Sequence, residues 1–131
     1  MSRLRYNGAA ASTLAEPLQT MRTTQRTVDG VEIIALDGRM TRNDGFGTVR
    51  RAVTDVLAAG HTQVLVDMGA VAYMDSTGVG ELVSAFITTR NHHGTLKLLN
   101  PSPRLRELLE VAKLTTVFEL FNDEATALLS F

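Results

Sequence analysis

Residues 63–90 read QVLVDMGAVAYMDSTGVGELVSAFITTR, and the fold is organised around this stretch. It opens on Val64-Leu65-Val66, a run of branched apolar residues that is typical of a strand buried on both faces. We expect a turn over residues 67–74, followed by a helix with Asp75 or Ser76 as its N-cap. The apolar residues of this helix recur at helical spacing, which predicts one buried face. Its members are Val79, Leu82, Val83, Phe86 and Ile87.

Two hydroxyl residues, Ser76 and Thr77, stand at the start of this helix beside Gly78 and Gly80. A helix N-terminus is exposed and electropositive, and the two glycines place no side chains around it. The position therefore suits a phosphate, bound or covalently attached. A phosphate on Ser76 would add about −1.5 to −2 charges without destabilising its own helix. Its effect would then fall on whatever docks over this surface. A role for Ser76 as a helix cap is the simpler interpretation, and the two roles are compatible.

The composition describes one ordinary globular domain. The chain has 131 residues, of which 44% are apolar and 21% charged, with a net charge of −1. Nothing in this charge favours a nucleic-acid partner, which needs a basic surface. The absence of cysteine excludes disulfides and cysteine nucleophiles. No apolar run approaches the roughly 18 residues of a membrane span, and we see no secretory signal. We therefore expect a cytoplasmic protein.

Strand and helix patterns alternate along most of the chain. Residues 1–20 are expected to be a flexible N-terminal arm, because small and polar residues precede Pro17. The remainder, residues 21–131, is predicted to be one α/β domain with a mixed five-stranded sheet covered by about four helices. Strands are expected at 21–28, 31–36, 64–66, 95–99 and 117–121, with a loop at 39–45. The other helices are expected from Phe46 to Leu57, after Pro101, and from Glu124 to about Ser130.

Catalytic, nucleotide-binding and metal-binding interpretations each have weak support. The Gly-x-Ser-x-Gly motif of many hydrolases is absent, since Met74 stands in the place of its first glycine. Gly78 and Gly80 lack the third glycine of a dinucleotide fingerprint. Asp67, Asp75 and Asp37 could bind magnesium at a sheet edge, but aspartates that cap turns or helices are commoner. We expect no catalytic residue, no cofactor and no metal.

With its neighbours, the motif Asp75-Ser76-Thr77-Gly78-Val79-Gly80 resembles a STAS domain, specifically a bacterial anti-sigma factor antagonist. The family pattern is an apolar strand that ends in Asp, here Asp67, followed by a turn and aromatic–apolar–Asp–Ser–Ser/Thr–Gly–apolar–Gly. Further matches are Gly38 and residues 96–100, 104–109, 113–118 and 123–128. The resemblance covers about residues 21–131 and implies the STAS fold for them.

The resemblance also implies a mechanism without enzymatic activity in this chain. The unphosphorylated antagonist sequesters an anti-sigma factor that is also a serine kinase, with a histidine-kinase-like ATPase fold, and so frees a sigma factor. The kinase phosphorylates the serine that corresponds to Ser76 and is released, and a serine phosphatase resets the system. The residues expected to contact the partner are Asp75, Ser76, Thr77, Gly78, Gly80, Arg39, Thr41 and Asp44.

The chain departs from the family pattern after the second strand. Many well-matched members carry an acidic residue two or three positions after the glycine that ends it, whereas Arg39-Met40-Thr41 follows Gly38 here, and Asp44 comes later. This departure bears on the identity of the partner more than on the fold. A second function also stays open. The chain could be a structural or accessory STAS subunit of a signalling scaffold or lipid-transport complex, with Ser76 only a cap. A hydrolase that uses Ser76 is a more distant third.

Overall fold

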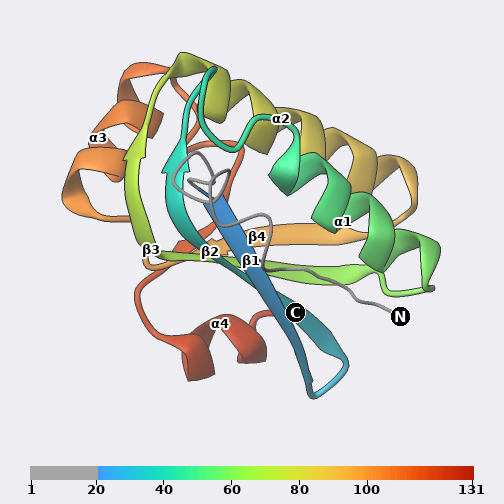
Figure 1. Ribbon diagram of the computed structural model, residues 1–131. Coiled ribbons are helices and arrows are strands. Elements are labelled where there is room, and N and C mark those ends of the chain that lie inside the picture. Colours follow the sequence, from blue (N-terminus) through green and yellow to red (C-terminus); the bar gives the residue numbers. More distant parts are fainter. Residues whose placement is uncertain (1–20) are drawn as a thin grey trace.

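The computed structural model describes residues 21–131, drawn in colour in Figure 1, and the expected N-terminal arm lies outside them. Strands and helices alternate as expected, which confirms the predicted α/β class with a mixed five-stranded sheet. The elements are β1 Met21–Val28, β2 Val31–Met40, α1 Thr48–Ala58, β3 Gln63–Met74, α2 Ser76–Asn91, β4 Thr95–Leu99, α3 Pro103–Val111, β5 Leu120–Phe121 and α4 Glu124–Leu129.

The order of the strands in the sheet follows the order of the chain, β1-β2-β3-β4-β5. β1 and β2 form an antiparallel hairpin, and every later pair is parallel. Parallel neighbours need a crossover, and α1, α2 and α3 supply the three crossovers. The last pair between β2 and β3 joins Met40 to Met74. The loop after β2 and the start of α2 therefore leave the sheet side by side.

The helices cover both faces of the sheet. Figure 1 shows α1 and α2 packed together on one side and α4 on the other. The larger core lies under α1, α2 and α3 and includes Ile34 and Val66. Their neighbours Ile33 and Leu65 point to the opposite face, where they pack with Ala127 of α4. This alternation explains why residues 64–66 are all apolar, because the central strand is buried on both sides.

Two strands are longer than expected and one is shorter. The turn predicted over residues 67–74 was wrong, since β3 continues to Met74, and β2 likewise continues through Gly38 to Met40. The two extensions pair with each other across register shifts, so each supplies the hydrogen-bond partner that overrides the local turn signals. The fifth strand, expected from Val117, contains only Leu120 and Phe121.

One predicted helix face needs correction, and two other helices leave a large apolar side chain exposed. In α2, Ile87 is 51% exposed, whereas Ala85 and Thr89 are buried, because the buried stripe follows small residues that allow close packing. Phe46 precedes α1 and is 61% exposed. In α4, Leu129 is 88% exposed, whereas Ala127 is buried and Leu128 packs against the same core cluster.

Candidate functional site

Asp75 holds the start of α2 and ties it to the loop after β2. Its Oδ1 accepts hydrogen bonds from the backbone N–H groups of Thr77 (2.9 Å) and Gly78 (3.1 Å), so it is the N-cap. Its Oδ2 accepts from the N–H of Arg42 at 3.2 Å, and its own N–H donates to the carbonyl of Met40 at 3.2 Å. Desolvation alone would raise the pKa of this carboxyl, but the N–H donors outweigh it and lower the pKa.

Ser76 is the first residue of α2, and its side chain is exposed. Because Asp75 provides the cap, the Ser76 hydroxyl has no capping task. It makes no hydrogen bond to another part of residues 21–131. Of the two caps left open by the sequence, the structure therefore selects Asp75. Ser76 is thus exposed at the electropositive end of a helix of 16 residues.

The two glycines of the motif have different surroundings. Gly78 is buried where three segments meet, and a Cβ on it would lie 2.4 Å from the carbonyl oxygen of Met40 and 2.6 Å from Cγ of Met74. Gly80 is exposed, and a Cβ there would meet nothing within 4 Å. Gly78 thus permits the close approach of α2 to the end of β2, whereas Gly80 leaves an open spot on the outer surface.

The other predicted site residues lie in and beside the loop after β2. The Thr41 hydroxyl donates to Oδ2 of Asp44 at 2.8 Å, and Arg39 forms an ion pair with the same oxygen at 3.2 Å. The Arg39 guanidinium also stacks on Tyr73, 5.1 Å from the ring centre. The loop joins Asp75 through Arg42, so the structure brings all eight predicted residues to one end of the sheet. Their roles in binding stay predictions.

Sequence reasoning missed Glu81, one turn after Thr77 on α2. Its Oε2 accepts a hydrogen bond from the N–H of Gly47, which is the N-cap of α1 and has no side chain to cap that helix. Glu81 therefore caps a neighbouring helix. With Phe46, Arg50 and Thr77 it lines a groove of about 340 Å³ between α1 and α2. Its four-residue spacing from Thr77 was visible in the sequence, but its partner in another element was not.

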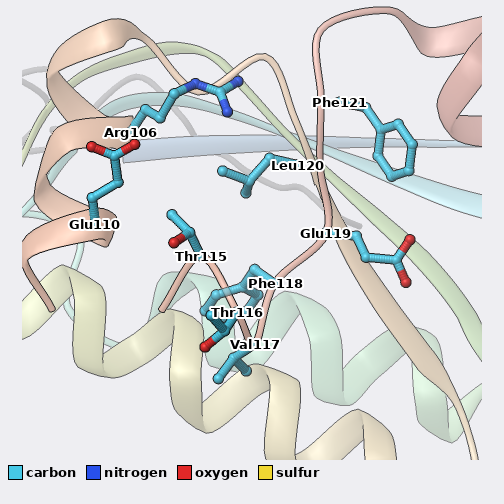
Figure 2. A pocket seen from close by; sticks show the side chains of 9 residues that line it. All are labelled: Arg106, Glu110, Thr115, Thr116, Val117, Phe118, Glu119, Leu120 and Phe121. Atoms are coloured by element: carbon cyan, nitrogen blue, oxygen red, sulfur yellow. The ribbon is translucent and has the colours of Figure 1, made fainter. Parts of the chain in front are cut away.

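A second hollow, of about 510 Å³, lies between α3 and residues 115–121 and contains none of the predicted site residues. Figure 2 shows Arg106 and Glu110 of α3 facing Leu120 across it, while Glu119 turns away. Arg106 also donates to Oδ1 of Asn122 at 2.9 Å. The mixed charges and open shape of this hollow suggest no particular ligand.

Within residues 21–131, no helix has both the length and the apolar character needed to cross a membrane. The same residues contain no group of three or more metal-binding side chains. Asp67, considered above for magnesium, accepts a hydrogen bond from the N–H of Gly69 at 2.9 Å, a local contact to the backbone of its own strand.

Fold and site together define a class of protein: small α/β domains that present a capped helix N-terminus and the preceding β–α loop on one surface. The sequence profile of the STAS domain matches residues 22–127, and the chain belongs to this family. The resemblance seen in the sequence is thereby confirmed.

Known relatives and structures agree with this assignment. The anti-sigma-B factor antagonist of Listeria monocytogenes is 41% identical over 59 residues, which is 45% of this chain and 52% of the relative, so the chain spans about half the length of that curated relative. An anti-sigma factor antagonist from Mycobacterium paratuberculosis has a similar structure, with a TM-score of 0.75, 20% identity and coverage of 85% of this chain and 93% of that one. The structure of the Bacillus cell fate determinant SpoIIAA in its phosphorylated form is also similar, with a TM-score of 0.63 and 22% identity. The match covers 82% of this chain and 96% of that one.

Proposed function

We propose that the chain is an anti-sigma factor antagonist, a binding protein rather than an enzyme. In its unphosphorylated form it sequesters an anti-sigma factor that is also a serine kinase, and so frees a sigma factor. Membership of the STAS family and the Listeria relative support this proposal. The single observation that carries the switch is Ser76, an exposed hydroxyl at the start of α2 whose capping role is taken by Asp75.

Phosphorylation of Ser76 by the bound kinase is the proposed off-switch, and a serine phosphatase is the proposed reset. A phosphate at this position adds about −1.5 to −2 charges beside the positive end of α2, where the helix tolerates negative charge. The fold is therefore expected to persist. The new charge and bulk act on the docked partner, which contacts Ser76 and the loop residues tied to Asp75. The proposed place of action is the cytoplasm, where sigma factors act.

The test starts from the purified chain, ATP and candidate anti-sigma factor kinases of the histidine-kinase-like ATPase fold. Intact mass and peptide mapping follow phosphate transfer, and affinity is measured before and after it. We expect one phosphate, on Ser76, and loss of binding to the kinase. Ser76→Ala is expected to accept no phosphate, whereas the matched control Thr54→Ala, which removes an exposed hydroxyl of α1 that does not line the groove between α1 and α2, should still be phosphorylated on Ser76. Binding to no candidate kinase, with no phosphate accepted, would contradict the proposal and favour a structural or accessory subunit.

A further inference from the structure

Two exposed arginines flank an exposed phenylalanine beside the start of α2. Arg42 and Arg50 are exposed, and neither guanidinium makes a hydrogen bond or ion pair with any other part of residues 21–131. Phe46 lies between them in the chain and is 61% exposed. These three residues are called the Arg42–Arg50 surface. An exposed aromatic side chain beside unpaired arginines has the composition of a protein interface, in which both residue types are enriched.

The acidic groups nearby do not neutralise these arginines. Asp44 is half-buried and is bonded to Thr41 and Arg39. Asp75 accepts backbone N–H groups at the start of α2, and Glu81 accepts the N–H of Gly47, while its other oxygen is buried. The acids are thus committed to inward contacts. The guanidinium groups are the charges that this part of the molecule presents to a partner.

The Arg42–Arg50 surface is continuous with the helix start that carries Ser76. Thr77 lines one hollow with Arg42 and Phe46, and it lines the groove between α1 and α2 with Phe46 and Arg50. A protein that docks over Ser76 will therefore also meet the phenylalanine and the two arginines. Charge complementarity then indicates what that protein carries at the contact.

We infer that the docking partner presents an acidic surface here, with carboxylates opposite Arg42 and Arg50 and an apolar side chain against Phe46. This inference rests on the proposed function and names the chemistry of its partner. It also gives the phosphate on Ser76 a specific action. The phosphate repels the partner's carboxylates and competes with them for the guanidinium groups, so the two anions cannot occupy the surface together.

Charge reversal tests the inference on the full chain with a kinase partner that binds the wild type. The variants are Arg42→Glu and Arg50→Glu, and the matched control is Arg51→Glu, an exposed neighbour on α1 that lines neither hollow. Each of the first two is expected to slow association by about tenfold at low salt and to flatten its salt dependence. The control should stay within about twofold. Equal rates for all three variants would overturn the inference while leaving the proposed function intact.

A peptide probe tests the same surface without any kinase. The full chain labelled with ¹⁵N is titrated with Glu-Glu-Leu-Glu-Glu and, separately, with Lys-Lys-Leu-Lys-Lys, and NMR shifts are followed. The acidic peptide should shift the signals of Arg42, Phe46 and Arg50, and Arg42→Glu should weaken its binding at least about fivefold. Equal shifts with the basic peptide would overturn the inference. It would also be overturned if the chain formed a dimer that Arg50→Glu dissociates, because the surface would then bind a second copy of the chain. If no kinase binds the wild type, the proposed function fails and this titration still decides the surface.

Discussion

Alanine at Gly78 and alanine at Gly80 are expected to change stability in opposite directions. Both residues lie within α2, where replacing glycine by alanine gains up to about 1 kcal/mol from helix propensity. At Gly80 the new methyl meets nothing within 4 Å, so the gain is kept. At Gly78 it would lie 2.4 Å from the Met40 carbonyl, which belongs to a strand and cannot rotate away.

The magnitude at Gly78 follows from the size of the overlap. Overpacking a close-packed site by one methyl costs about 1–3 kcal/mol, and two contacts at 2.4 and 2.6 Å, one of them with backbone, place this case at the upper end. After subtraction of the propensity gain, Gly78→Ala is expected to lower the free energy of unfolding by about 1–2 kcal/mol. Gly80→Ala should raise it by about 0.5–1 kcal/mol.

The free energy of unfolding of both variants is measured by urea denaturation followed by circular dichroism. An unchanged slope of the transition confirms that only stability has changed. The same two proteins are then tested for partner binding. Gly80→Ala separates the two properties, because reduced binding by a more stable protein would place Gly80 in the interface. A stabilised Gly78→Ala variant would refute the argument from close approach, since it would show that α2 and β2 move apart freely.

Three further outcomes follow from the described contacts. Asp75→Ala should lower the free energy of unfolding by about 1 kcal/mol at neutral pH, because the N-cap is lost. Folding lowers the pKa of Asp75, so this contribution is present above the usual carboxyl pKa and disappears as the pH falls through the lowered value. The urea midpoints of wild type and variant should therefore converge in acid. Ser76→Asp should keep the wild-type urea midpoint within about 0.5 kcal/mol but lose kinase binding, and an unfolded variant would contradict the role given to the helix dipole. Lys97, 5% exposed, donates to the carbonyl and the hydroxyl of Ser130, at 2.8 and 2.9 Å, so Lys97→Met should speed amide exchange in α4, whereas the exposed Lys113→Met should not.

Local signals predicted several elements because each signal acts within a few residues. The strand at 95–99 has the expected bounds. Ser102 caps α3 and Pro103 occupies its first turn, where a missing N–H costs nothing. Gly60 follows α1 with a φ of 97°, the left-handed conformation that glycine adopts easily. These features need no distant partner.

The candidate site was predicted in part. The motif placed Asp75 and Ser76 at the start of a helix, and the structure agrees because capping depends on the next two or three backbone N–H groups. The contact between this helix start and the loop after β2 was expected from the family resemblance alone. Glu81 was missed, since its partner Gly47 lies 34 residues away in the chain.

By itself, the sequence determined the alternation of strands and helices, the buried central strand at residues 64–66 and the start of α2 at Asp75 or Ser76, since period and capping are properties of short segments. The tertiary structure decided how far β2 and β3 extend, because their last residues become strand only by pairing with each other. It also decided that Gly78 is a packing position while Gly80 is open, and that Phe46 is exposed between two arginines. These outcomes depend on which surfaces meet when the chain folds, and apolar periodicity along one segment carries no information about its neighbour.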